Sequence, residues 1–163
     1  MKKIQHQPLI RVVALLLAGI SPPLDSSLFA QSSPTDEPAK SSEAKATVVV
    51  NITSGIDDLH AACMGIGLAR TAIESGRRAV IFLNVNAPAL AAADLPAGLK
   101  FADFPPVKGM LADFVAAGGE LYVCGHCAAI CTVDESKLIE GAVISHHEDL
   151  FKKLPASALS FSY

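Results

Sequence analysis

The sequence predicts an α/β fold in three layers, α/β/α, built on a mainly parallel five-stranded sheet. Continuous apolar runs rich in β-branched residues, such as "ATVVVNI" at 46–52, are typical of strands buried on both faces. Segments with helical periodicity alternate with these runs, and short polar segments follow them. Such alternation indicates a parallel sheet with helices on both faces. Residues 46–163 have the length of one domain.

The first half of this domain begins with the strand at 46–52, and a helix from Asp57 to Ser75 follows it. Acidic residues in the first turn suit the positive end of the helix dipole, and Gly76 ends the helix. The run "RAVIFLNV" at 78–85 predicts the second strand. Apolar residues recur along the helix with helical spacing at Leu59, Cys63, Ile66, Ala69 and Ile73.

The second half begins with a loop that contains Pro88 and Pro96, and a second long helix follows. Pro105 and Pro106 open this helix, because proline is well tolerated in a first turn, and Gly118-Gly119 end it. The residues expected to face inward are Val107, Leu111, Phe114 and Ala117. Three further strands are expected at 120–124, 142–144 and 158–163.

The letters "SHHE" at 145–148 predict the start of another helix. In a capping box, a serine side chain accepts from the backbone three residues on, and a glutamate there reaches back. We therefore expect Ser145 to cap this helix and Glu148 to complete the box.

The N-terminus has the order of a secretory signal peptide: positive charge, a short apolar run at 12–20, then small and polar residues. We expect cleavage after Ala30, which makes residues 1–30 the signal peptide. The segment 31–45 is rich in serine, proline and charge, which predicts a flexible leader. The predicted location is the periplasm, with no membrane attachment after cleavage.

Composition argues against a nucleic-acid partner. The chain has a formal net charge of −3, no tryptophan and only two tyrosines. No block of basic residues marks a surface that would bind phosphates.

The segment "LYVCGHCAAIC" at 121–131 holds three of the four cysteines. Its first cysteine ends a predicted strand, and ligands of parallel α/β sheets bind beyond the carboxyl ends of the strands. Clustered cysteines indicate reactivity or metal binding more often than a framework of disulfides. A redox pair, a sulfur carrier, a metal site and a structural disulfide all fit this pattern.

Cys124 is the candidate nucleophile, because a helix that begins beside it, at 126–131, would favour the thiolate. Cys127 is the candidate resolving thiol, since two intervening residues allow a tight disulfide. The letters "CGHC" equal the motif of protein disulfide isomerases, which we take as a chemical analogy. Cys131 lies four residues beyond Cys127, and it could resolve, bind metal or pack.

The nearby histidines are candidate supporting residues. His126 lies inside the motif, where positive charge would favour a thiolate. Of the adjacent pair His146 and His147, we expect one to face the cysteines. Cys63 is expected to be a small core residue. The residues expected to lie on the surface or to satisfy strand-end backbone groups are His60, Asn84 and Asn86.

The domain resembles the DsrE/DsrF-like family, the sulfur-relay proteins that include the TusD and YchN types. The resemblance rests on "VVVNITSG", "FVAAGGELYVCGHC", "LIEGAVISHHEDLFKKL" and the terminal "ALSFSY". It implies an α/β/α fold, a homotrimer or homohexamer, and persulfide sulfur on the cysteine before the "LIEG" segment, which is Cys124. The YchN-type pattern has a second cysteine that Cys127 matches. Where the family often has an Arg-Gly pair, this chain has Cys131 and Thr132.

The sequence therefore predicts a periplasmic protein that accepts or relays sulfane sulfur through Cys124, with donor and acceptor proteins or small sulfane-sulfur compounds as partners. We expect no cofactor. One alternative is a non-catalytic oligomeric binding module in which the cysteines form a structural disulfide, and another is a thiol–disulfide oxidoreductase. A soft-metal site for Zn(II) or Cu(I) ranks behind these.

Overall fold

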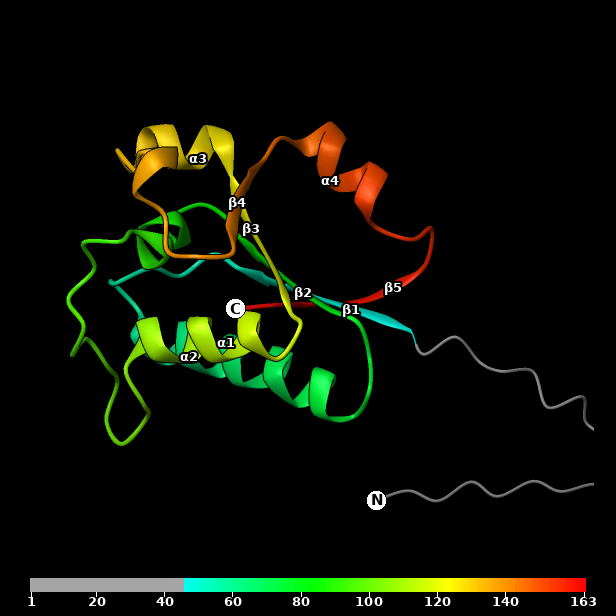
Figure 1. Ribbon diagram of the computed structural model, residues 1–163, viewed down its shortest axis with the longest axis horizontal. Helices are drawn as coiled ribbons and strands as arrows, with labels where there is room; N and C mark the ends of the chain where they lie inside the picture. Colours follow the sequence, from blue (N-terminus) through cyan, green and yellow to red (C-terminus); the bar gives the residue numbers. More distant parts are fainter. Residues whose placement is uncertain (1–45) are drawn as a thin grey trace, which may run out of the picture. The chain divides into compact units, whose positions relative to one another are not determined.

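Five strands form one sheet in the order β4-β3-β2-β1-β5, and every neighbouring pair is parallel (Figure 1). The computed structural model describes residues 46–163, so the predicted signal peptide and leader lie outside the described residues. The predicted sheet is confirmed, and it is entirely rather than mainly parallel. The strands are β1 (Thr47–Ile52), β2 (Ala79–Leu83), β3 (Glu120–Cys124), β4 (Ala142–Ser145) and β5 (Ala158–Ser162).

Helices lie on both sides of this sheet (Figure 1). The α-helices are α1 (Leu59–Glu74), α2 (Val107–Ala116), α3 (Gly125–Ile130) and α4 (His147–Lys153). Two short 3-10 helices, η1 (Ala87–Ala91) and η2 (Glu135–Lys137), lie in the connections. In Figure 1, α1 and α2 lie below the sheet and α4 lies above it. Within residues 46–163, no helix is both long enough and apolar enough to cross a membrane.

The main core lies between the sheet and the α1–α2 layer. Alternate residues of each strand point into it, such as Val50 of β1 and its register partner Ile81 of β2. All five residues of β2 are buried, as its unbroken apolar run predicts. The opposite face carries a smaller cluster, in which Leu150 of α4 packs near Phe82 and Tyr122.

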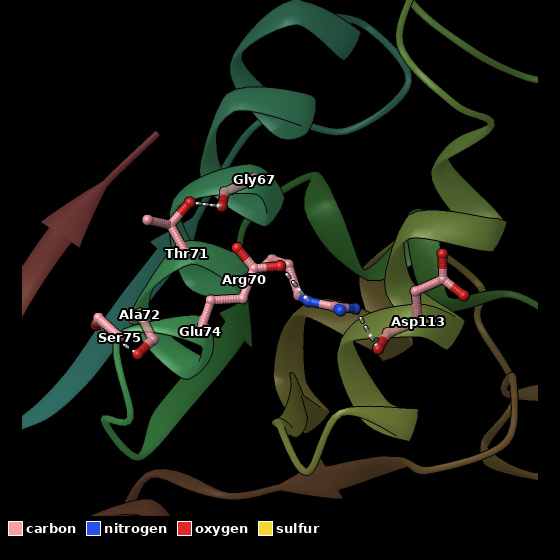
Figure 2. Close-up of polar contacts among 7 residues, drawn as sticks. All are labelled: Gly67, Arg70, Thr71, Ala72, Glu74, Ser75 and Asp113. Atoms are coloured by element: carbon pink, nitrogen blue, oxygen red, sulfur yellow. Dashed lines mark hydrogen bonds and ion pairs between the residues drawn. The ribbon is translucent and has the colours of Figure 1, made fainter.

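A polar contact also joins α1 to α2. Figure 2 shows Arg70 of α1 extending toward α2, where Nη1 donates to the carbonyl oxygen of Asp113 at 3.0 Å. The Nε atom of the same guanidinium pairs with Glu74 one turn along α1, also at 3.0 Å. Since this ion pair is exposed, we expect it to orient the arginine more than to stabilise the fold.

The chain reverses direction across the sheet after β4. Successive connections carry it from β1 to the edge strand β4, and α4 then returns it to the far side of β1, where β5 pairs. Ala128 of α3 belongs to the main core, whereas Leu150 of α4 belongs to the cluster on the opposite face. The connections that follow β3 and β4 therefore diverge. A crevice between such connections is where α/β sheets bind ligands.

The predicted capping box is wrong. Ser145 is the last residue of β4, where it pairs in register with Cys124 and is buried. Its hydroxyl donates to the carbonyl oxygen of His146 at 3.3 Å, and His146 is the residue that caps α4, without a side-chain bond. The reason is that β4 extends one residue further than predicted, which places the serine inside the sheet.

Two of the other differences at element ends matter for the site. The first long helix begins at Leu59, because Asp58 caps it by accepting from the backbone N–H of Ala61 at 3.0 Å. The strand β2 ends at Leu83, before Asn84. As a result, polar residues that were predicted to belong to this helix and this strand lie in loops at the carboxyl edge of the sheet, where the cysteines lie.

Candidate functional site

The cysteine cluster lies at the carboxyl end of β3, as predicted. Cys124 is the last residue of this strand and also the N-cap residue of α3. Its sulfur accepts the backbone N–H of Cys127 at 3.3 Å. An N-cap side chain normally meets the backbone N–H two or three residues on, and here a sulfur takes this role. The predicted helix start beside Cys124 is confirmed, and it directs a backbone donor at the sulfur.

The sulfur atoms of Cys124 and Cys127 are 2.8 Å apart, and all four cysteines are free thiols. A disulfide bond is about 2.05 Å long, so a small shift of either side chain would close one. The structure therefore brings the two predicted thiols together as a pair.

Cys127 also contacts the end of β2. Its thiol donates to Oδ1 of Asn84 at 3.0 Å, and the same oxygen accepts the backbone N–H of Val85 at 2.8 Å. Burial raises the pKa of Cys127, and the hydrogen bond with Cys124 raises it further. Cys127 therefore holds its proton to a higher pH than an ordinary cysteine, which suits a thiol that donates to an amide oxygen.

Backbone strain surrounds the third cysteine. Val85 has φ of 54° and Thr132 has φ of 55°, in the left-handed region that β-branched residues avoid. This conformation costs about 1–2 kcal/mol for each such residue. The carbonyl oxygen of Val85 accepts from the thiol of Cys131 at 3.4 Å. The strained turn thus places backbone groups against the cysteines, and strain of this kind gathers at functional sites.

The loop after β1 holds this turn in place through contacts with Asn86. Asp57 accepts the backbone N–H of Gly55 at 2.9 Å and the side-chain N–H of Asn86 at 3.2 Å. These hydrogen bonds hold the pKa of Asp57 below its usual value, with the Gly55 bond as the largest cause. A Cβ atom at Gly55 would overlap the carbonyl oxygen of Asn86, so only glycine lets the two loops approach this closely.

Two separate cavities open beside the cluster. The first, of about 450 Å³, lies between the segments that follow β3 and β4 and is lined by Cys124, Ser145 and the residues next to them. The second, of about 350 Å³, lies at the C-terminal end of α3 and is lined by Cys131, Thr132 and parts of the η1 and η2 segments. The three clustered cysteines therefore do not share one opening.

The predicted supporting histidines line the first cavity. His126, His146 and His147 all contribute to its wall, together with Glu148 and Asp149. The ring of His146 lies against Gly125, where an added Cβ atom would be 2.9 Å from Cε1. His146 is thus the histidine of the adjacent pair that contacts the residue next to Cys124.

The other candidates lie apart from the cluster. Cys63 is fully buried in the main core, where burial raises its pKa, and the core role predicted for it is confirmed. His60 lies on the exposed side of α1 and stacks on Phe101 with 4.6 Å between ring centroids. Among residues 46–163, no group of three or more histidine, cysteine, aspartate or glutamate side chains is arranged to hold a metal ion.

The sequence did not reveal the roles of Asn84, Val85 and Gly55. We expected Asn84 only to satisfy strand-end backbone groups; it does so for Val85, and it also accepts from the Cys127 thiol. A signal was present, because an asparagine directly after a buried parallel strand lies at the edge where sites form. No local signal predicts a valine with positive φ.

A disulfide between Cys124 and Cys127 is expected to change thermal stability very little. It would close a loop with only two intervening residues, which removes little entropy from the unfolded chain. Structural disulfides have reduction potentials below about −300 mV, and we expect this pair to lie well above that bound. Titration against a glutathione redox buffer, with thiols trapped and counted by mass, measures the potential. A very low potential together with a large drop in melting temperature on reduction would instead indicate a structural disulfide.

The fold and the paired thiols together define a small α/β protein with a cysteine at the carboxyl edge of a parallel sheet. The chain belongs to the DsrE/DsrF-like family, whose model matches residues 46–159. The family prediction made from the sequence is thereby confirmed. No curated protein matches the chain.

The solved structures with a similar fold include two proteins of low sequence identity to this chain. The ychN protein from E. coli is 20% identical with a TM-score of 0.56, over 72% of this chain and 99% of that one. MTH1491 from Methanobacterium thermoautotrophicum, a protein of unknown function, is 14% identical with a TM-score of 0.56, over 73% of this chain and 100% of that one. At these identities the likeness establishes the fold alone.

Proposed function

We propose that this protein accepts sulfane sulfur on Cys124 as a persulfide and uses Cys127 as the resolving thiol. The observation that carries the proposal is the pair of free thiols 2.8 Å apart, of which Cys124 lines an open cavity. The family to which the chain belongs is in general one of sulfur relay. The strand-end position of Cys124 supports the same chemistry, because it holds the cysteine at the carboxyl edge of the sheet, where it lines the first cavity.

The first step is the attack of the Cys124 thiolate on the outer sulfur of a donor. A bond forms between this sulfur and the sulfur of Cys124, and the bond to the donor breaks, so the donor leaves as a thiolate with the electron pair. The outer sulfur can then pass to an acceptor thiol. Alternatively, Cys127 attacks the sulfur of Cys124, which releases hydrosulfide, and the two cysteines are oxidised to a disulfide.

The first cavity offers room and polar groups for this exchange. Three histidines in its wall, beside the carboxylates of Glu148 and Asp149, supply imidazole N–H groups that could donate to a persulfide or polysulfide. His146 supports the site most directly, because its ring lies against Gly125 beside the nucleophile. His126 lies one residue further along and lines the same cavity.

We place this chemistry in the periplasm, on the basis of the signal-peptide pattern at residues 1–30. The partners would be sulfur donor and acceptor proteins, or small sulfane-sulfur compounds that enter the first cavity. An oxidising compartment makes a reductant for the cysteine pair necessary, since disulfides persist there.

The test is the intact mass of the purified protein before and after incubation with a polysulfide donor. We expect the protein to gain sulfur on one cysteine and to lose it again when a thiol reductant is added. A protein that gains no sulfur at any donor concentration at which free thiols react would contradict the proposal.

We also propose that the protein assembles as a homotrimer or homohexamer. The cluster on the second face of the described sheet takes one buried residue from an α-helix, Leu150 of the short helix α4. Ser160 and Ser162 of β5 are exposed. Oδ1 of Asn51 on this face is buried without a hydrogen-bond partner within the described residues. Such an unsatisfied group is costly, and a second copy of the chain could supply the missing donor. Light scattering is expected to give a trimer or hexamer, and a monomer at micromolar concentration would contradict this proposal.

A further inference from the structure

Cys131 opens to a different cavity from Cys124. Cys124 lines the cavity between the segments after β3 and β4, whereas Cys131 lines the cavity that the η1 and η2 segments enclose. No described residue lines both cavities. The two thiols at the ends of the cluster therefore lie at different cavities.

Cys127 lies between these two thiols. Its sulfur is 2.8 Å from that of Cys124, and its carbonyl oxygen accepts the backbone N–H of Cys131 at 2.8 Å, one helical turn along. Residues four apart on a helix lie on the same side. The thiols of these two cysteines also donate to consecutive residues just after β2: Cys127 to Asn84, and Cys131 to Val85. Cys127 thus contacts the thiol of Cys124 and lies one helical turn before Cys131.

The position of Cys131 at the end of α3 allows it to approach Cys127. The Cβ atoms of residues four apart on a helix are about 5–6 Å apart, and a disulfide needs about 3.5–4.5 Å, so the approach is roughly 1–2 Å. Cys131 is the C-cap residue, and the chain leaves the helix at Thr132. A shift of this size therefore moves only the last turn of the helix.

We propose that Cys131 is a third working thiol, which takes over the disulfide from Cys124 and presents it to a thiol reductant in the second cavity. The inference rests on the proposed function, because the first disulfide arises when Cys127 resolves the persulfide on Cys124. To that function it adds a third working residue, a second cavity, and a second class of substrate, which is thiols.

The exchange is balanced in atoms and electrons. The Cys131 thiolate attacks the sulfur of Cys127, so the Cys127–Cys131 bond forms and the Cys124–Cys127 bond breaks. Cys124 leaves as a thiolate with the electron pair, and the proton lost by Cys131 is available to it through solvent. A reductant thiol then attacks the sulfur of Cys131, and a second equivalent completes the reduction to two protein thiols and one small disulfide.

This arrangement separates the two half-reactions in space. Once the bridge has moved to Cys131, Cys124 is again a free thiol in the first cavity and can accept more sulfur. The reductant acts in the second cavity, so it does not compete with the sulfur donor for one opening. It also does not meet the persulfide on Cys124, which a thiol would otherwise reduce.

Differential alkylation tests the exchange. The purified protein is treated with a stoichiometric amount of polysulfide and quenched with N-ethylmaleimide, then reduced and labelled with a second alkylating reagent. Peptide mass spectrometry is read only for molecules that carry the second label on Cys127. The first label lies on Cys131 when Cys127 is bridged to Cys124, and it lies on Cys124 when Cys127 is bridged to Cys131.

In the unmodified protein we expect the first label on Cys124 in a substantial part of these molecules. In Cys131→Ser this population is lost, although sulfur uptake by Cys124 continues. Ala129→Ser, a change on the exposed side of the same helix, is the matched control and should behave like the unmodified protein. If the unmodified protein never shows the first label on Cys124 in these molecules, the proposal is overturned.

The outcomes separate this inference from the proposed function. A protein that takes up sulfur but never forms the Cys127–Cys131 bridge retains the proposed function and loses the third thiol. A protein that takes up no sulfur loses the proposed function. In that case the exchange is measured after oxidation with diamide, which closes the first disulfide without sulfur, and absence of the second bridge there overturns the exchange as well.

Discussion

Cys124→Ser is expected to abolish sulfur uptake from a polysulfide donor completely, because serine cannot form a persulfide. The substitution should leave the fold intact. A serine hydroxyl at this position can accept the backbone N–H of Cys127, as the sulfur does now, and serine is among the preferred N-cap residues. Intact mass after incubation with polysulfide measures the uptake, and circular dichroism shows that the helices remain.

Cys63→Ala is the matched control for this experiment. Cys63 is fully buried in the main core, and burial raises the pKa of its thiol. Cys124 is also buried but lines the first cavity, whereas Cys63 lines neither of the two cavities beside the cluster, so Cys63 should not react with a polysulfide in the folded protein. We expect the control to take up as much sulfur as the unmodified protein. If Cys124→Ser takes up sulfur as well as the control does, Cys124 is not the carrier.

The position of Cys124 could be predicted from the sequence because two simple patterns agree on it. The apolar run before it marks a buried strand, and the alternation with helices makes the sheet parallel. In a parallel sheet, the residue after such a run lies at the ligand-binding edge whatever the rest of the fold does. The observed strand Glu120–Cys124 has the predicted bounds.

The contacts of the other two cysteines could not be predicted, because they depend on segments far apart in the sequence. Cys127 and Cys131 contact Asn84 and Val85, more than forty residues earlier in the chain. The strained backbone of Val85 depends on the bracing from Asp57, Gly55 and Asn86, which is also non-local. Sequence patterns describe neighbours along one element, and these contacts join three loops.

The second cavity could not be predicted from the sequence for the same reason. Its walls come from the η1 and η2 segments, which an isolated bridge between Ala92 and Leu138 holds together. The sequence indicated only a proline-containing loop in the first of these segments. Cys131 could therefore be recognised as a candidate, but the cavity to which it opens could not.

The fold that positions Cys124 depends strongly on one aromatic residue, Phe114 of α2. This side chain is fully buried and is among the largest in the core. A Cβ atom at Gly119 would overlap its ring, so the ring packs directly on the turn that leads into β3. The backbone N–H of Gly119 also donates to the carbonyl oxygen of Phe114 at 3.0 Å. The ring therefore supports both the core and the start of the strand that ends at Cys124.

Phe114→Ala is accordingly expected to lower the free energy of unfolding by about 3–5 kcal/mol, the cost of truncating a buried aromatic residue. That is a large part of the roughly 5–15 kcal/mol by which a domain is stable. Phe151→Ala is the matched control, because Phe151 is 77% exposed and its loss should change stability by less than about 0.5 kcal/mol. Urea unfolding at one protein concentration measures both changes, since self-association would otherwise alter the midpoint. Equal effects of the two substitutions would mean that Phe114 does not support β3 as its burial indicates.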